Sequence, residues 1–364
     1  MYRQVIILLI ANLVILLTNL SADFNEKLQL LVTQEPPKWM LQQINKDLEI
    51  YKAKGISQES IDRLMRAPGN EYSVRYKIQS QHISYLTNDE GTFLQGRRNQ
   101  IVDALNKLAA AVQLPNVEIV INPLDVAFSC PDTTLAPAFV FAKNKYNNNQ
   151  ILIPDLDALS NYGGVGKQIE TAKKKFPWIS KKDQAFWRGA STGGSFHTEM
   201  WRELARAKLV LLSLKNSKYL NARFSQFVQG AEINPSMQAM PELKGLAVTQ
   251  ADSLKYKYLV DVDGNTCSWQ RMYWILLSNS VLLKQVTDNI EWYYGNLKPN
   301  EHFIPVKEDL SDLIEKINWA KSNDGKARKI AKNATQFAKK NLSEEMVFLY
   351  LYWVLVRYAE LQTT

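Results

Sequence analysis

Short apolar runs in this sequence end in polar loops and are followed by helical patterns at several places along the chain. Tyr256–Val262 (YKYLVDV) runs into Asp263-Gly264-Asn265, and a helix is predicted to begin near Ser268. Earlier in the chain, an amphipathic helix over Arg97–Val112 precedes a buried strand at Val117–Ile121. Such alternation of strands and helices is typical of α/β proteins with parallel sheets.

The same patterns predict the remaining elements of the fold. Further strands are expected at Tyr72–Leu86, Ala138–Ala142, Ile151–Ile153, Ala185–Trp187, Val281–Lys284 and Phe303–Val306. Further helices are expected at Trp39–Arg66 (interrupted near Gly55 and restarted with Ser57 as cap), Thr198–Ala207, Ser311–Trp319, Lys326–Lys339 and Ser343–Leu361. Because strands alternate with helices in both halves, we expect an α/β fold of two parallel-sheet lobes with a cleft between them.

A chain of 364 residues is too long for one simple core, so two domains are expected. We assign residues 23–165 to a first α/β lobe and 166–340 to a second, with the boundary at a glycine-rich break, Gly163-Gly164-Val165-Gly166. The last helix, within residues 341–364, is predicted to pack back on the lobes because its apolar residues recur at helical spacing.

The N-terminus, residues 1–22, carries a targeting signal. Arg3 precedes thirteen mostly apolar residues, Val5–Leu17, and the acidic residues Asp23 and Glu26 follow. A spanning helix needs about 20 apolar residues, whereas a signal-peptide core needs roughly 7–15. The length therefore favours a signal peptide or a short membrane anchor, with the body of the protein exported or membrane-associated. A buried or surface-lying first helix is the alternative.

Charge and composition limit the classes of ligand and partner that this protein can bind. Lys and Arg outnumber Asp and Glu by 44 to 36, a formal net charge of +8 that suits a sugar nucleotide, a nucleic acid or an acidic membrane surface. The sequence contains no nucleic-acid-binding motif. Three His and two Cys show no metal-ligand spacing, so neither a metal nor another cofactor is expected. Cys130 and Cys267 can form one bridge, although two buried thiols are favoured.

In parallel sheets, ligands bind beyond the carboxyl ends of the strands, and three loops qualify. The first runs from Arg188 to Gly194, where glycines admit a phosphate and Arg188 can grip an anion. The second, Asp263–Ser268, opens a helix whose N-terminus suits a pyrophosphate, with Arg271 one turn in; a plain helix cap is the alternative. The third ends in Asp125, a candidate general base or merely a turn former.

Asp261-Val262-Asp263 spells an Asp-x-Asp pattern that can hold a divalent cation. Consecutive strand residues point to opposite faces of a sheet, and Asp261 lies within an apolar strand. We therefore interpret the pair as structural, and no metal site is predicted.

Several segments taken together resemble glycosyltransferase family 90, which includes protein O-glucosyltransferases, capsule xylosyltransferases and lipopolysaccharide-modifying enzymes. The strongest is Leu254–Lys284, and Phe186–Gly189 and His302–Val306 with Asp309–Ser311 are similar to two further motifs. Asp47–Ile61 and Leu114–Asp125 are also similar, in the right order. The resemblance spans roughly residues 40 to 340.

The resemblance implies a GT-B-like fold with two Rossmann-like lobes, inversion at the anomeric carbon, a UDP-sugar donor and no required metal. Asp125 matches the catalytic base. The residues counted as UDP-sugar contacts are Arg188, Gly189, Ser191, Thr192, Thr266, Ser268, Arg271 and His302. Some members have a second arginine where this chain has Ser191, and the pocket-shaping loop maps near Pro154–Leu159, which matches poorly.

The implied reaction is transfer of a hexose or pentose, glucosyl or xylosyl, to a hydroxyl of a glycan, lipopolysaccharide or protein. A non-catalytic sugar-binding protein on the same scaffold is an alternative, and it would predict loss of the base or the arginines, which are present. A phosphotransferase would need a Walker-type lysine or paired metal carboxylates, and the sequence has neither.

Overall fold

The computed structural model describes residues 22–87, 91–92, 94–126, 132 and 134–363. The apolar segment Val5–Leu17 and Cys130 lie outside the described residues. Among the residues described, no helix is both long and apolar enough to cross a membrane.

The first sheet has the strand order β3-β2-β4-β5-β7. Its strands are β2 (Val74–Gln79), β3 (His82–Thr87), β4 (Val117–Ile121), β5 (Ala138–Val140) and β7 (Gln150–Leu152). The neighbours β4, β5 and β7 are parallel, but β2 pairs antiparallel with both β3 and β4. The expectation of a wholly parallel first sheet is therefore wrong. The cause is a tight hairpin turn at Ser80 and Gln81, whose positive φ angles of 50° and 66° return the chain directly.

The second sheet has the order β13-β11-β10-β8-β9, and all its pairings are parallel, as predicted. Its strands are β8 (Lys182–Ala190), β9 (Leu220–Gln226), β10 (Tyr256–Asp261), β11 (Val281–Gln285) and β13 (Ile304–Val306). The sequence analysis missed β9, although its buried residues, Leu220, Ala222 and Phe224, alternate with polar ones, which is the pattern of a half-buried strand. It also predicted β8 to end at Trp187, three residues too early.

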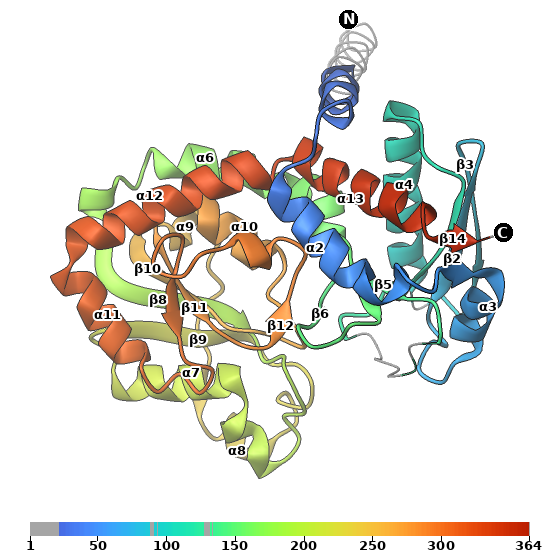
Figure 1. The fold of residues 1–364 in the computed structure, drawn as a ribbon. Coiled ribbons are helices and arrows are strands. Elements are labelled where there is room, and N and C mark those ends of the chain that lie inside the picture. Colours follow the sequence, from blue (N-terminus) through green and yellow to red (C-terminus); the bar gives the residue numbers. More distant parts are fainter. Residues whose placement is uncertain (1–21, 88–90, 93, 127–131, 133, 364) are drawn as a thin grey trace, which may run out of the picture.

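Helices cover both sheets (Figure 1). A helix over residues 22–32 comes first. It is followed by α2 (Lys38–Leu48), α3 (Gln58–Arg66), α4 (Gln95–Ala111), α5 (Leu156–Leu159), α6 (Val165–Lys173), α7 (Ala205–Lys215), α8 (Pro235–Gln238), α9 (Gln250–Ser253), α10 (Gln270–Leu277), α11 (Leu313–Ser322), α12 (Asp324–Asn341) and α13 (Glu344–Ala359). The predicted caps of α3 and α13 are confirmed, since Ser57 Oγ and Ser343 Oγ each accept a backbone N–H.

The helix expected at Thr198–Ala207 is misplaced in the prediction. A 3-10 turn occupies Glu199–Glu203, and α7 begins only at Ala205. Leu204 between them has an extended backbone (ψ 139°), which interrupts helical hydrogen bonding.

The two sheets are joined by a short antiparallel pair, β6 (Lys143–Asn144) with β12 (Asn289–Ile290). Beside this junction, Lys143 Nζ lies 2.6 Å from Asp47 Oδ1 of α2, and both side chains are almost fully buried. Asp47 also accepts hydrogen bonds from Gln43 Nε2 (2.9 Å) and from Leu152 N of β7 (3.0 Å). The buried ion pair thus ties α2, β6 and β7 together.

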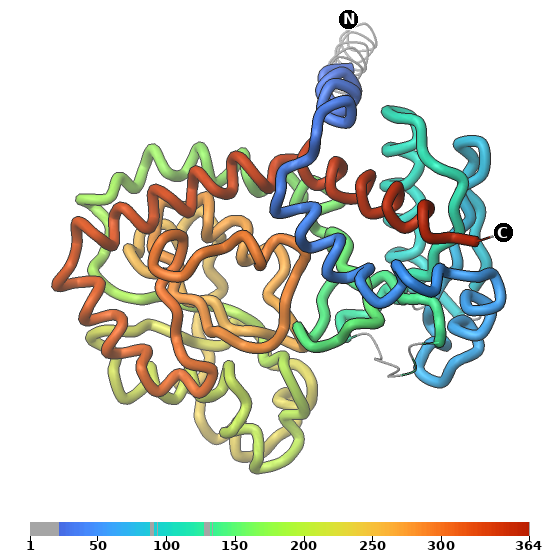
Figure 2. Tube along the Cα trace, in the orientation of Figure 1, coloured from blue at the N-terminus to red at the C-terminus, as the bar shows by residue number. Residues whose placement is uncertain are grey.

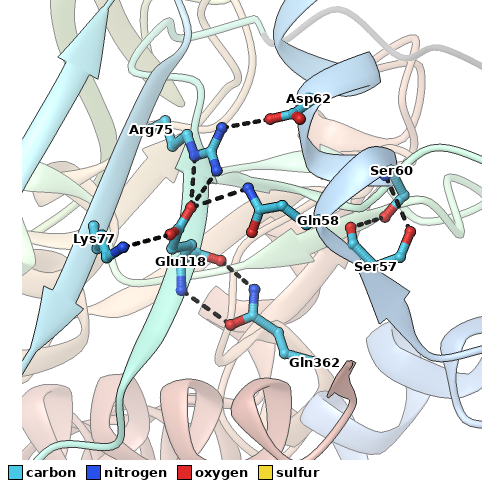
Figure 3. A network of polar contacts seen from close by, with 8 residues as sticks. All are labelled: Ser57, Gln58, Ser60, Asp62, Arg75, Lys77, Glu118 and Gln362. Carbon is cyan, nitrogen blue, oxygen red and sulfur yellow. Dashed lines mark hydrogen bonds and ion pairs between the residues drawn. The ribbon is translucent and has the colours of Figure 1, made fainter. Parts of the chain in front are cut away.

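The C-terminal segment returns to the first sheet, as the trace in Figure 2 shows. The Tyr358 ring of α13 lies 4.9 Å from that of Phe139 in β5, and β14 (Gln362–Thr363) pairs with β1 (Ile56–Ser57). Figure 3 shows the hydrogen bonds that hold β14 against β4: the Gln362 side-chain amide donates to Glu118 O and accepts from Glu118 N. The Glu118 carboxylate in turn is paired with Arg75 and Lys77.

Candidate active site

Asp125 lies in the loop that leaves the carboxyl end of β4. Asn122 Oδ1 accepts the Leu124 N–H at 3.1 Å, which turns the chain directly after the strand. Arg97, in the first turn of α4, donates to Pro123 O (2.6 Å) and to Asp125 Oδ1 (2.8 Å). The Asp125 side chain is 33% exposed, so it is held by the protein and still open to a ligand.

The loop after β10 of the second sheet meets Asp125 from the other side. Thr266 Oγ1 donates to Asp125 O at 2.8 Å, and Asn265 Nδ2 donates to Asp125 Oδ2 at 3.3 Å. Two of the three loops selected from the sequence, one from each sheet, are therefore in direct contact. Asp125 from the first sheet and Asn265 and Thr266 from the second meet at this junction.

A pocket of about 260 Å³ opens beside the junction. It is lined by Arg97, Gln100, Asp125, Phe141, Asp155, Leu156, Asp157 and Trp269. Burial, followed by the neighbouring Asp157, raises the pKa of Asp155 to about 7, and burial also raises the pKa of Asp157. The stretch Pro154–Leu159, expected to shape the pocket, does contribute to its wall.

The N-terminus of α10 faces this pocket. Trp269 precedes the helix with φ 53° and ψ −128°, a strained conformation for a residue with a side chain. The Gln270 backbone N–H lies 3.4 Å from Asp157 Oδ2, and its side-chain Nε2 donates to Tyr162 O at 2.9 Å. A side chain of the loop before α10 does not cap it; instead, a carboxylate from the first half of the chain approaches the helix end.

Arg188 and Gly189 are strand residues, not loop residues as the sequence suggested. The Arg188 guanidinium donates to Asn221 Oδ1 (2.9 Å) and to the carbonyls of Trp187, Asn221 and Leu246, so it is engaged within the second sheet. A Cβ on Gly189 would lie 2.5 Å from the Trp187 ring. The glycine is therefore needed for packing, and no turn follows the arginine.

Arg271 reaches towards β8 and donates to Arg188 O at 2.6 Å. Its guanidinium carbon lies 5.5 Å from the centre of the Trp187 ring. Both arginines line a smaller pocket of about 120 Å³, to which Trp187 and Trp274 also contribute and Asp125 does not. The structure thus brings Arg188 and Arg271 to one place, beside the junction and not into the Asp125 pocket.

The remaining predicted donor contacts lie in different surroundings. Ser191 Oγ donates to Val228 O (2.8 Å) and accepts from Val228 N (2.7 Å), linking the loops after β8 and β9. Ser268 Oγ is buried with no hydrogen-bond partner among the residues described. His302 precedes β13, accepts the Lys298 N–H at 3.1 Å and packs its ring on Phe337 of α12. It is not part of the wall of either pocket.

Arg206 of α7 is a candidate that the sequence analysis missed. Only 8% exposed, it donates to Asp263 O (3.0 Å) and Ala190 O (2.9 Å), at the carboxyl ends of β10 and β8. Burial, reinforced by the charge of Arg271, lowers its pKa to about 9. A Cβ on Gly264 would lie 2.8 Å from Arg206 Nη2 and 3.0 Å from Thr192 Oγ1, so the guanidinium lies against Gly264, where the two predicted phosphate loops approach each other.

Thr192, Gly193, Asp263 and Gly264 line a further pocket of about 260 Å³, to whose wall the neighbouring Ala205 contributes and Arg206 does not. The sequence does contain a signal for this arginine. Arg206 shares a helical stripe with the buried residues Leu209, Val210 and Ser213, and a charged residue on a core-facing stripe indicates a specific role.

The two carboxylates at the end of β10 differ in their partners. Asp261 is fully buried with Lys284 Nζ 3.6 Å away, and neither of its carboxylate oxygens has a hydrogen-bond partner among the residues described. Asp263 Oδ2 accepts from Thr287 Oγ1 (2.7 Å) and Asn289 Nδ2 (3.1 Å). Within the described part of the chain, no three His, Cys, Asp or Glu side chains gather in a way that could hold a metal ion. Cys267 is buried, and burial raises the pKa of its thiol.

Comparison with known proteins gives a consistent family. Residues 34–364 match the model described as glycosyl transferase family 90. The chain is 30% identical over 329 residues to "Protein O-glucosyltransferase 2" of Danio rerio, covering 88% of this chain and 62% of that protein. It is 32% identical over 301 residues to "Protein O-glucosyltransferase 3" of Mus musculus, covering 80% of this chain and 56% of that protein. The chain thus spans less than two thirds of these relatives.

Among solved structures, a glycosyltransferase from Rickettsia africae ESF-5 aligns with a TM-score of 0.41 and 10% identity, covering 75% of this chain and 83% of that one. This likeness is too distant to support a conclusion about fold or function.

Proposed function

The chain belongs to glycosyl transferase family 90, and we propose that it is an inverting glycosyltransferase of GT-B type that moves a sugar from a UDP-sugar to an acceptor hydroxyl. The observation that supports this most is the position of Asp125. A partly exposed carboxylate lies at the junction of two strand-end loops, one from each sheet, beside a pocket large enough for a sugar ring.

In the proposed reaction, Asp125 accepts the proton of the acceptor hydroxyl as that oxygen attacks the anomeric carbon, on the face opposite the leaving UDP. A carboxylate offers about four acceptor positions, and Arg97 and Asn265 occupy two of them. Positions remain for the acceptor hydroxyl. The three-carboxylate wall of the pocket is suited to hydrogen bonding with sugar hydroxyls.

Negative charge grows on the diphosphate as the glycosidic bond to UDP breaks, and positively charged groups must stabilise it. We assign this role first to Arg206, which donates to backbone carbonyls at the bases of the loops that carry Thr192 and Gly264. Arg188 and Arg271 add positive charge from the adjoining pocket and hold the end of β8 on which the donor rests. No metal ion is needed in this scheme.

The donor and acceptor follow from the relatives. Because those named are protein O-glucosyltransferases, we propose a glucosyl donor, with xylosyl as the variant to compare, and a hydroxyl of a protein, glycan or lipopolysaccharide as acceptor. Residues 1–22 would direct the protein to export or to a membrane.

A donor panel tests the proposal. The purified protein is incubated with UDP-glucose, UDP-xylose and UDP-galactose, and release of UDP is followed without acceptor and then with candidate acceptors. Donor hydrolysis by the wild type, lost in Asp125→Asn, is the expected result. A non-catalytic sugar-binding protein would bind a donor or glycan in both forms and release UDP in neither, and that outcome would refute the proposal.

A further inference from the structure

Asn265, in the loop after β10, connects the proposed base to the loops after β8 and β9. Its Nδ2 donates to Asp125 Oδ2 at 3.3 Å. Its Oδ1 accepts from Gln229 Nε2 (2.9 Å), in the loop after β9, and from Gly193 N (3.3 Å), in the loop after β8. Gln229 Oε1 also accepts from Gly193 N at 3.1 Å. One exposed amide therefore joins the loops after β8, β9 and β10 to a carboxylate of the other sheet.

The other oxygen of Asp125 is held from its own side of the junction. Arg97 donates to Asp125 Oδ1 and, through its second terminal nitrogen, to Pro123 O. Because Pro123 is two residues before Asp125, this guanidinium fixes both the loop backbone and the carboxylate. The two carboxylate oxygens thus have separate partners, one from each half of the molecule.

We propose that Asn265 and Arg97 are positioning residues that orient the Asp125 carboxylate, and that Asn265 makes this orientation depend on the donor loops. The proposal rests on the proposed function, in which Asp125 is the base. A carboxylate anchored at only one oxygen can rotate about its side-chain torsions, and misplacement of a catalytic group by about 1 Å can cost roughly a hundredfold in rate. The contact with the loops after β8 and β9 links base orientation to the segments that surround the donor.

The expected effect is on turnover and not on donor affinity. Asn265→Ala should lower kcat roughly tenfold, the loss expected when one hydrogen bond to a charged group is removed, while the dissociation constant for UDP changes less than about twofold. Asn265→Asp should lower kcat further, because it removes the donor and places a like charge beside Asp125. Asn333→Ala on α12 is the matched control, away from the junction, and should leave both quantities unchanged.

The decisive readout is coupling to Asp125. If Asn265 acts through the base, Asn265→Ala should have no further effect on the residual rate of Asp125→Asn. If that residual rate is too slow to follow, the combination of Asn265→Ala with Arg97→Gln supplies the test, since the losses in kcat should not be additive. Thermal unfolding of each variant shows whether the fold is retained.

The possible results distinguish failure of the positioning role of Asn265 from failure of Asp125 as the base. An active Asp125→Asn variant would remove Asp125 as base and the positioning role with it. An inactive Asp125→Asn variant combined with a normal kcat for Asn265→Ala would refute the positioning role alone. Equal fractional losses from Asn265→Ala in both backgrounds would assign Asn265 a general structural role instead.

Discussion

Replacing Arg206 by alanine tests the part of the site that the sequence did not reveal. The side chain is 8% exposed and donates to carbonyls at the ends of two neighbouring strands, at 2.9 and 3.0 Å. If its guanidinium also supports the donor diphosphate, a charge-assisted contact worth about 1.5–3 kcal/mol is lost, which corresponds to roughly a ten- to hundredfold weaker affinity for UDP. Turnover should fall further than affinity, because the leaving diphosphate gains charge in the transition state.

Isothermal titration with UDP measures the affinity, and thermal unfolding of the same samples shows that the fold is retained. Arg202→Ala is the matched control: that arginine is four residues earlier, exposed, and paired with Glu199, so its loss should change UDP binding less than about twofold. Arg206→Lys should recover only part of the affinity, since lysine lacks the planar fork. A folded Arg206→Ala variant with wild-type UDP affinity would refute this assignment.

Chelation with EDTA should leave transfer unchanged, because Asp261 is fully buried beside Lys284 and Asp263 is hydrogen-bonded by Thr287 and Asn289. Loss of activity that manganese restores would contradict this. The pKa of Asp155 is raised to about 7, so between pH 4 and 7 the unfolded chain loses this proton and the folded chain keeps it. The contribution of Asp155 to stability therefore falls as pH rises, so the unfolding free energy of Asp155→Asn should increase relative to that of the wild type across this pH range. If the difference in unfolding free energy between the two proteins does not change with pH, the raised pKa is refuted. Lys143→Ala should lower the unfolding free energy by about 3–5 kcal/mol by leaving Asp47 buried without its cation, whereas Lys145→Ala, from an exposed pair, should cost less than about 1 kcal/mol; similar costs for both would show that burial is not decisive.

Much of the fold could be predicted because many of its helices and strands follow from local patterns of apolar and polar residues. The strand Val117–Ile121 has the predicted bounds, and the buried strand β10 stands out from its apolar run. The strand β9 was missed although its buried residues alternate with polar ones, because it has no apolar run like those of β4 and β10. The antiparallel hairpin in the first sheet was not anticipated, since its turn residues, Ser80 and Gln81, are not the glycine or asparagine that usually take positive φ.

The sequence predicted those site residues whose position follows from the end of their own strand. It did not predict those whose position depends on contacts between elements that are far apart in the chain. Asp125 and Thr266 were selected as strand-end residues, and the structure brings them together. Arg188 was taken for a loop residue because a glycine follows it, yet Gly189 is required by the ring of Trp187 within the strand. Arg206 lies on the core-facing stripe of its helix, which was an available signal, but its contacts with two strand ends depend on tertiary packing.

The proposal that Asp125 is the base of a UDP-sugar-dependent transferase can be checked by measuring the rate of Asp125→Asn with the donor that the wild type uses. General base catalysis contributes about 10²–10⁴-fold, so kcat should fall by at least about a hundredfold, with the dissociation constant for UDP within twofold of wild type. A folded variant that keeps more than about a tenth of the wild-type rate would show that Asp125 is not the base.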